Sequence, residues 1–223
     1  MSANGHSRHP DLLDVIRDRR SIRHYARQPV ERYLVQRLLE AARWAPSNWN
    51  GQPWVFVVLD DPASIGRVYA ALDVRAAAVT ESSGADARLV RFVEHCRAYF
   101  AVLRDCPVLI AACYKPTGQV FEGAVAEHLH DAGGVAAWNP NLLSLGMAVQ
   151  NLLLCAHAAG LGACFHSGPV AFLRGSFHEL LGLPRRLELA GFVTLGWPDA
   201  DVPPQVHRKP LAHAVRWAGE PGA

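Results

Sequence analysis

The 223-residue sequence predicts an α+β protein, on two observations. In most of the amphipathic segments, apolar residues recur at the spacing of a helix. We therefore expect more helices than strands. The β-branched and aromatic runs do not alternate regularly with these helices, as a doubly wound parallel sheet would require. Half of the residues are hydrophobic, which is enough for a substantial core, and we expect one domain over residues 1–223.

The N-terminal third predicts two helices and a strand. One helix is expected from about Asp11 through the "RDRR" cluster, and a second from about Pro29. The second must end before Pro46, because a residue that precedes proline is pushed out of the helical region. The run "WVFVVLDD" is rich in β-branched and aromatic residues, which is typical of a buried strand. The stretch "WAPSNWNGQPW" from Trp44 to Trp54 therefore joins a helix to a core strand.

The rest of the chain predicts four helices and three strands around an unpatterned segment. Between Lys115 and Pro140, glycines, histidines and acidic residues follow no clear period, which suggests a lid. We place a variable lid segment at about residues 70–140 and a C-terminal tail at residues 198–223. The remaining elements are, in order, helices over about 63–80 and 85–104, the strand "PVLIAACY", a long apolar helix over about 141–160, the strand "LGACFH", a helix over about 170–181 and the strand "LELAGFVTLGW".

The charge balance argues against a nucleic-acid partner. The formal net charge is only +2, so any basic site must be local. The N-terminal residues lack the apolar core of a signal peptide. Residues 142–165 are long enough to span a bilayer, but Gln150, Asn151 and His157 favour the buried helix of a soluble protein. We therefore expect no membrane partner.

The cysteines and the acidic residues predict neither disulfides nor a metal site. Five cysteines without a C-x-x-C pair are typical of buried free thiols in a cytoplasmic protein. The stretch "EHLHD" lacks the spacing of zinc ligands. The glycines of "AAGLGAC" end a helix and precede a strand, the reverse of a dinucleotide fingerprint. No Ser-His-Asp or Cys-His pattern can be argued, so we name no catalytic residue.

The strongest local signal is a cluster of cations. The stretch "RRSIRHY" places Arg19, Arg20 and Arg23, with Ser21, at the end of the first expected helix. Guanidinium groups suit the oxygens of a phosphate. The alternative is that these cations only complement the dipole of the helix. A second basic pair occurs in "HRKP" near the C-terminus, where solvated surface residues are the simplest interpretation.

The loop before the first strand carries an unusual set of polar side chains. Ser47, Asn48, Asn50 and Gln52 supply donors and acceptors that suit the polar edge of a heterocycle, and the prolines and tryptophans around them stiffen the backbone. The alternative is a capping loop whose polar groups satisfy only their own backbone.

Several separated motifs together resemble one family. The stretches "DRRSIRHYARQPV", "LLEAARWAPSNWNGQPWVFVVL", "SLGMAVQNLLLCAHAAGLGACFHSG", "LLGLP", "LGWP" and "RKPL" are similar, in this order and spacing, to the nitroreductase family of FMN-dependent oxidoreductases. The resemblance implies a nitroreductase-like fold, in which helices flank a central, mostly antiparallel sheet. It also implies an intertwined homodimer with FMN sites at the subunit interface.

The resemblance implies FMN-binding roles for four groups of residues. In the family, an Arg-Arg-x-x-Arg cluster with an internal serine holds the phosphate and the ribityl chain. A Pro-Ser-x-x-Asn-x-Gln loop reaches the ring or the ribityl chain, a turn after a strand lies against the isoalloxazine, and a basic residue near the C-terminus joins the phosphate site. The matching positions here are Arg19, Arg20, Ser21 and Arg23; Pro46, Ser47, Asn50 and Gln52; His166, Ser167 and Gly168; and Arg208.

The sequence departs from the family pattern in two places. Many members have Gly-Gly or Glu-Gly where this chain has Ser167 and Gly168 preceded by His166. Trp49 replaces a residue that is usually small, and we expect it to narrow the substrate cavity. The proline-rich tail, which ends in apolar residues that include Leu211, Val215 and Trp217, is suited to wrapping a partner subunit; docking on its own domain is the alternative.

The resemblance implies an oxidoreductase that transfers a hydride from NAD(P)H through FMN to an electron-poor acceptor such as a nitroaromatic or a quinone. One pocket shared by both substrates predicts ping-pong kinetics. Two alternatives stay open. One is a specialised reaction within the family, either reductive dehalogenation or a flavin-fragmenting synthesis. The other is a non-catalytic FMN-binding protein.

Overall fold

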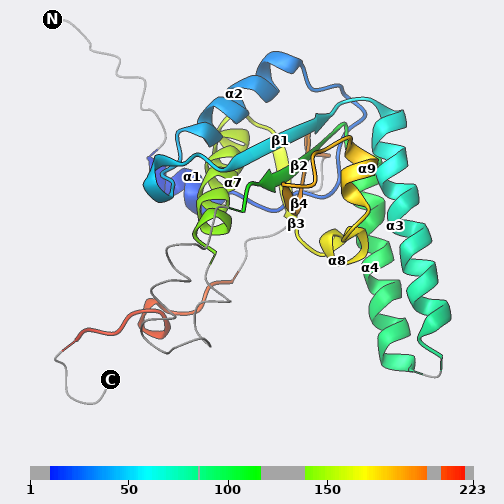
Figure 1. Cartoon of the computed structure of the whole chain (residues 1–223). Coiled ribbons are helices and arrows are strands. Elements are labelled where there is room, and N and C mark those ends of the chain that lie inside the picture. The colour runs from blue at the N-terminus through cyan, green and yellow to red at the C-terminus, as the bar shows by residue number, and fades with distance from the viewer. Residues whose placement is uncertain (1–10, 85, 117–138, 200–206, 219–223) are drawn as a thin grey trace, which may run out of the picture.

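The centre of the fold is a four-stranded antiparallel sheet (Figure 1). The computed structural model describes residues 11–84, 86–116, 139–199 and 207–218. The strands lie in the order β1-β2-β4-β3, and every neighbouring pair is antiparallel. Their bounds are β1 Trp54–Leu59, β2 Val108–Tyr114, β3 Gly162–His166 and β4 Glu188–Gly196. The expected α+β class and antiparallel sheet are therefore confirmed.

Helices α2 (Arg32–Arg43) and α7 (Pro140–Ala158) cover one face of the sheet. In α2 the buried residues Val35, Leu38 and Ala42 recur at helical spacing and form one apolar stripe. Helix α7 begins where the Asn139 side chain accepts a hydrogen bond from the backbone N–H of Leu142, which caps the first turn. The two helices pack on each other and on alternate residues of the inner strands.

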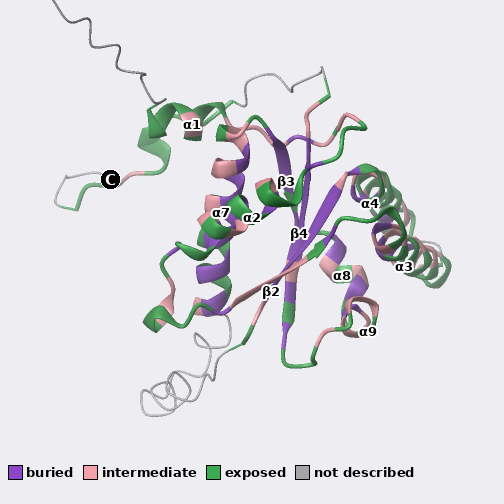
Figure 2. Cartoon of the chain, turned by 90° about the horizontal axis from the view of Figure 1, so that it is seen from above, coloured by how far each residue is buried: buried purple, intermediate pink, exposed green. Residues whose placement is uncertain are grey.

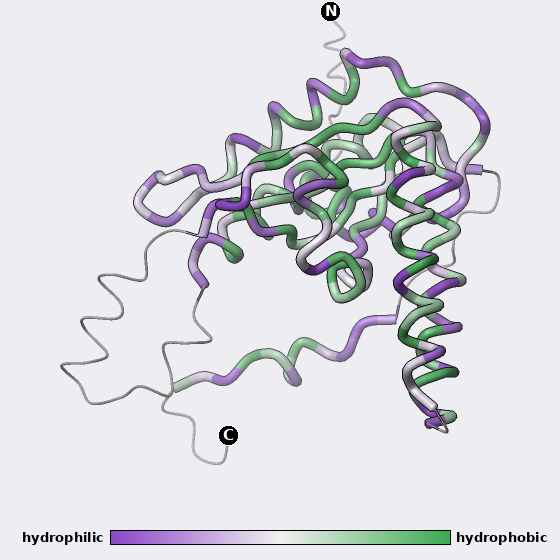
Figure 3. Tube along the Cα trace, turned by 45° about the vertical axis from the view of Figure 1, so that its right-hand side comes forward, coloured by the Kyte–Doolittle hydropathy of each residue, from purple (hydrophilic) through white to green (hydrophobic). Residues whose placement is uncertain are grey.

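The opposite face carries α3 (Pro62–Ser82), α4 (Ala87–Asp105), α8 (Pro169–Leu173) and α9 (Phe177–Leu181), as seen from above in Figure 2. Helices α3 and α4 pack against each other and project beyond the end of the sheet (Figure 1). Along these two helices hydrophilic and hydrophobic residues alternate, whereas the strands are mainly hydrophobic (Figure 3). The central strands are thus buried on both faces.

The first helix and the helix expected over 170–181 differ from the prediction. Helix α1 spans Leu12–Asp18 and ends before the arginine cluster, because Arg19 is already extended, with ψ of 131°. The second helix is broken into α8 and α9, because Gly175 between them adopts a left-handed φ of +85°. The other helices and the strands lie within a few residues of the expected positions.

Helix α7 is long and apolar enough to cross a bilayer by length and composition, and no other helix in the described ranges is. Its buried residues, which include Leu145, Leu152 and Ala156, pack in the core on the α2 face of the sheet. Asn151 donates a hydrogen bond to the backbone carbonyl of Ala41, 3.2 Å away. The expectation of a buried core helix is confirmed.

The described part of the expected lid segment contains the end of α3, all of α4 and the strand β2. Because β2 pairs on both sides, it is fixed within the sheet. Residues 117–138 of the expected lid lie outside the described residues. The stretch "EHLHD" also lies outside them.

The sheet has two edges, and each carries one part of the expected site. The loop from Trp44 to Pro53 leads into β1, the strand at one edge. The segment after α1 runs along β3 at the other edge, where Ser21 forms a parallel bridge with Ala163. Three strand spacings separate the two edges, which is roughly 14 Å at about 4.8 Å per strand.

Candidate functional site

The segment of residues 19–23, which we call the arginine segment, is held on β3 by backbone contacts. The N–H of Ile22 donates to the carbonyl of Ala163 at 3.1 Å. Gly162 makes this approach possible, since a Cβ at that position would lie 2.6 Å from Cγ2 of Ile22. The pKa of the Cys164 thiol is raised by burial, and Arg23, Ser21 and Arg19 act in the opposite direction. The segment therefore places its polar side chains beside the edge strand.

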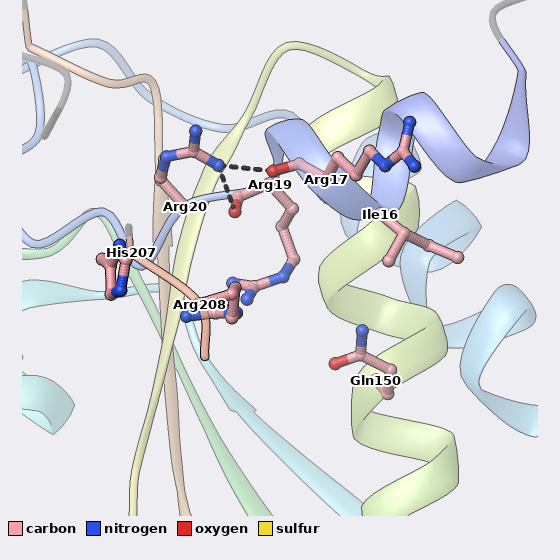
Figure 4. A pocket seen from close by; sticks show the side chains of 7 residues that line it. All are labelled: Ile16, Arg17, Arg19, Arg20, Gln150, His207 and Arg208. Atoms are coloured by element: carbon pink, nitrogen blue, oxygen red, sulfur yellow. Dashed lines mark hydrogen bonds between the residues drawn. The ribbon is translucent and has the colours of Figure 1, made fainter. Parts of the chain in front are cut away.

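Four arginines line one cavity of about 650 Å³, which we call the arginine cavity (Figure 4). Arg17, Arg19 and Arg20 come from α1 and the segment after it, and Arg208 comes from the C-terminal part of the chain. Ile16, His207 and Gln150, the last from α7, complete the lining. Cavities of this size hold drug-sized ligands.

The charge in the arginine cavity has no carboxylate to balance it among its lining residues. None of the four arginines forms a salt bridge with another described residue. Arg20 donates to the backbone carbonyls of Arg17 and Arg19, at 2.7 and 3.0 Å, which fixes its direction. The Nε of Arg19 is buried and has no hydrogen-bond partner within the described ranges. Fixed cations with free donors are suited to an anion such as a phosphate.

A second cavity, of about 320 Å³, lies where β3 ends and faces α4; we call it the His166 cavity. Arg23, His166 and Gly168 line it on one side, and Tyr99 and Phe92 of α4 lie among the residues on the other. The guanidinium carbon of Arg23 lies 5.7 Å from the centroid of the Tyr99 ring. Its Nε is buried without a hydrogen-bond partner in the described part of the chain.

A chain of hydrogen bonds fixes His166. The Tyr25 hydroxyl donates to the carbonyl of Ile22 at 2.6 Å and lies 2.7 Å from Oγ1 of Thr194, which lies 3.0 Å from Nε2 of His166. The Tyr25 hydroxyl uses its only proton on Ile22, and the Thr194 hydroxyl donates to Tyr25 or to the Cys164 carbonyl, 3.4 Å away. In either case Nε2 of His166 donates to Thr194. Burial, with Arg23 nearby, lowers the pKa of His166 to about 4. His166 is thus neutral near pH 7, with Nδ1 as an acceptor.

The loop from Trp44 to Pro53 is closed by its own polar groups and tied to α7. The backbone N–H of Gln52 donates to Oγ of Ser47 at 3.0 Å, and that of Asn48 donates to Oγ of Ser144 at 3.1 Å. The Gln52 side chain donates to the backbone and side-chain oxygens of Asn50 at 3.4 and 3.5 Å. Asn50 and Gln52 also line a third cavity, of about 350 Å³, with Trp44.

The structure brings together some of the predicted residues and separates others. Arg19, Arg20 and Arg208 share the arginine cavity, and Arg23, His166 and Gly168 share the His166 cavity. Ser21 lies on β3 beside them, and Ser167 is exposed at the turn after the strand. The remaining four, Pro46, Ser47, Asn50 and Gln52, lie with their loop at the opposite edge of the sheet.

Sequence reasoning missed five residues around these cavities. Arg17, His207 and Gln150 line the arginine cavity, and Thr194 and Tyr25 hold His166. The sequence could have indicated Gln150, because a polar amide in an otherwise apolar helix requires a hydrogen-bond partner or a ligand. Nothing in the sequence indicated Thr194, since a threonine is common in a strand.

Comparison with known proteins identifies the family. The model of the nitroreductase family matches residues 16–197. The chain belongs to the nitroreductase family. An NADH dehydrogenase of Thermus thermophilus is 32% identical over 89% of this chain and 92% of its own length. A 5,6-dimethylbenzimidazole synthase of Rhodospirillum rubrum is 29% identical over 89% and 88%.

A solved structure of the same family contains a flavin. A Desulfovibrio desulfuricans protein described as a nitroreductase in complex with FMN has a TM-score of 0.65 and 27% identity to this chain, over 96% of this chain and 99% of its own. This nitroreductase-family chain thus resembles proteins with different named activities. Family membership fixes the class, and the individual reaction depends on the site.

Proposed function

We propose that this protein is an FMN-dependent oxidoreductase that transfers a hydride from NAD(P)H through the flavin to an electron-poor acceptor such as a nitroaromatic or a quinone. The single observation that carries the proposal is the arginine cavity. It combines Arg17, Arg19, Arg20 and Arg208 without a carboxylate in its lining. Three of these, Arg19, Arg20 and Arg208, match positions to which the resemblance assigns the phosphate of FMN.

The residues present fit FMN. The terminal phosphate needs several fixed donors, and Arg19, Arg20 and Arg208 supply them. The buried and unpaired Nε atoms of Arg19 and Arg23 give a ligand two further donors within the described part of the site. The cavity at His166 and Gly168 adds an aromatic wall for a flat ring, as Tyr99 and Phe92 border it.

When bound, FMN supplies the hydride chemistry, and the protein supplies binding, orientation and electrostatics. Arg19, Arg20 and Arg208 would hold the phosphate, and Arg23, which lines the His166 cavity, would stabilise negative charge on the bound group. His166 lines the same cavity and carries no charge near pH 7. The apolar residues of α4 exclude water from that side.

The proposal includes a homodimer with two sites. Pro46, Ser47, Asn50 and Gln52 lie at the β1 edge, so they would complete the site of a partner subunit instead of their own. An apolar surface is available for a second copy: Leu12, Leu13 and Ile16 of α1 are exposed, as are Leu142, Leu143 and Met147 of α7. Exposed apolar patches of this kind are typical of subunit interfaces.

The C-terminal tail is consistent with that assembly. Leu211 and Trp217 are exposed, and Val215 is only half-buried. Beyond Arg208, which lines the arginine cavity, the described part of the tail lies away from the sheet (Figure 1). We propose that this tail covers the partner subunit. The free thiols of all five cysteines agree with the proposed cytoplasmic location.

The test starts with the visible spectrum of the purified protein. Flavin absorption bands are expected, followed by bleaching with NADH or NADPH and recovery on addition of a nitroaromatic or a quinone. A yellow protein inert to both nicotinamides would leave a non-catalytic flavin-binding protein. A colourless protein that binds no added FMN would reject the proposal.

The relative named 5,6-dimethylbenzimidazole synthase defines a second candidate. In that case reduced flavin would be consumed in the presence of oxygen, and 5,6-dimethylbenzimidazole would accumulate. Chromatography of the products after aerobic incubation with excess reduced FMN separates the two activities.

A further inference from the structure

Thr194 of β4 is a buried residue that connects two parts of the candidate site. Its side chain is fully enclosed and lines neither the arginine cavity nor the His166 cavity. Its Oγ1 lies 2.7 Å from the hydroxyl of Tyr25, which follows Arg23 by two residues, and 3.0 Å from Nε2 of His166 at the end of β3. One hydroxyl that a ligand cannot reach therefore joins both elements that carry Arg23 and His166.

The hydrogen bonds of Thr194 select one tautomer of His166. Thr194 has a single proton, which goes to Tyr25 or to the carbonyl of Cys164, so its oxygen accepts from Nε2–H of His166 in either case. A neutral imidazole carries one ring proton, and His166 is neutral near pH 7 because burial, with Arg23 nearby, lowers its pKa to about 4. Nδ1 of His166 therefore has no proton.

The protein itself does not use Nδ1 of His166. Among the described residues Nδ1 has no hydrogen-bond partner, and it is not one of the nitrogen atoms that are buried without one, as Nε of Arg23 is. The ring of His166 lines the His166 cavity, which Arg23 also lines. This cavity is therefore the space that Nδ1 can reach, and an acceptor and a cation border it together.

We propose that Thr194 is a positioning residue for the ligand of the His166 cavity: its hydroxyl holds His166 in the Nε2–H tautomer, so that Nδ1 faces the ligand as an acceptor instead of a donor. The inference rests on the proposed function, in which that ligand is the ring of FMN. A flavin gains negative charge on reduction, which a nearby donor stabilises and an acceptor does not. The tautomer therefore offsets Arg23 and keeps the reduction potential of bound FMN lower than a donating His166 would.

Loss of the Thr194 hydroxyl should change the tautomer. In Thr194→Val the buried Nε2–H of His166 would lack an acceptor, which is unfavourable. The ring avoids this by carrying its proton on Nδ1, from which it donates into the cavity. Thr194→Ser keeps the hydroxyl. Tyr25→Phe keeps the tautomer too, because Thr194 can then donate to Cys164 and still accept from His166.

The first measurement is the tautomer itself, read from the 15N chemical shifts of the imidazole nitrogens in the full-length protein at pH 7 without added FMN. His166→Asn identifies the signals of His166 among those of the 11 histidines. Wild type, Thr194→Ser and Tyr25→Phe should carry the proton on Nε2, and Thr194→Val should carry it on Nδ1. A wild type with the proton on Nδ1 would overturn the inference even if Thr194→Val did not fold.

The second measurement is the midpoint potential of bound FMN, from reductive titration against a reference dye. Thr194→Val should raise the affinity for reduced relative to oxidised FMN by roughly tenfold, as expected for one hydrogen bond to a charged group. For a two-electron couple, this ratio raises the potential by about 30 mV. Thr194→Ser and Tyr25→Phe should leave the potential unchanged.

Thr80→Val is the matched control, because it removes the hydroxyl of a half-buried threonine in α3 that donates to the carbonyl of Ala76 at 3.1 Å and lines neither cavity. It should leave the potential unchanged. Equal potentials for Thr194→Val and Thr80→Val, in protein that binds FMN, would overturn the inference while the proposed function stands. A wild type that binds no FMN would overturn the proposed function and this inference together.

Discussion

Arg19 and Arg23 each keep a buried Nε without a hydrogen-bond partner in the described part of the chain. Buried donors of charged groups are seldom left unpaired, because the loss of their hydration destabilises the folded state. An anion that accepts from them removes this cost when it binds. The unpaired donors therefore lower the stability of the ligand-free protein and raise its affinity for an anion.

Removal of one guanidinium should weaken FMN binding. Arg19→Ala removes hydrogen bonds to a charged group, for which a net loss of about 1.5–3 kcal/mol, or roughly 10- to 150-fold in Kd, is expected. Quenching of FMN fluorescence measures this Kd. Arg185→Ala is the control, because Arg185 pairs at 3.7 Å with Glu179 on the exposed surface. Equal Kd values for Arg19→Ala and Arg185→Ala would contradict the phosphate site.

His166 should make stability depend on pH. Its pKa is about 4 in the folded protein, below the ordinary value of 6.5, so between these values the unfolded chain binds more protons. The contribution of neutral His166 to the free energy of unfolding is complete above pH 6.5. This contribution falls as the pH drops to 4, by up to about 3 kcal/mol. Urea unfolding of wild type and of His166→Asn at pH 7 and 4.5 measures it. The stability of the variant should fall less than that of wild type over this interval.

Gly162 of β3 lets the arginine segment lie directly against the strand. A Cβ there would lie 2.6 Å from Ile22, a buried residue of that segment. Since a contact this short cannot be kept, an alanine must push the segment away from the strand. The arginines of the segment would then move away from the other residues that line the two cavities.

Gly162→Ala is expected to weaken FMN binding at least tenfold and to lower the melting temperature, because overpacking costs about 1–3 kcal/mol. Gly66→Ala in α3 is the matched control, since no atom lies within 4 Å of the added Cβ. A helical alanine there should stabilise the protein by about 0.5–1 kcal/mol. Thermal unfolding and FMN titration of both variants provide the comparison.

The elements that could be predicted from sequence are those with a strong local signal. The β-branched runs predict β1 and β2, and the apolar stripe predicts α2, each to within a few residues of its observed bounds. The break at Gly175 and the left-handed Trp49 could not be predicted, because both depend on packing that no local period records. The strand order, which separates the loop at Asn50 from Arg19, follows from long-range pairing.

For the whole molecule, the exposed apolar face of α7 predicts a dimer. Leu143 is 61% exposed near the start of α7, and a charge there should oppose association. Leu143→Glu is expected to run as a monomer in size-exclusion chromatography with light scattering, and to lose FMN. Val74→Glu, at an exposed position of α3, should stay dimeric. A monomeric wild type would contradict the shared site.

The proposed division of the site between the two edges of the sheet has a genetic consequence. A chain with Arg19→Ala and a chain with Asn50→Ala would each form homodimers in which both sites are damaged. In a mixed dimer, one site would carry both substitutions and the other would carry neither. Co-expression of two poorly active chains should therefore recover activity that neither has alone, whereas a site built within one chain would allow no such complementation.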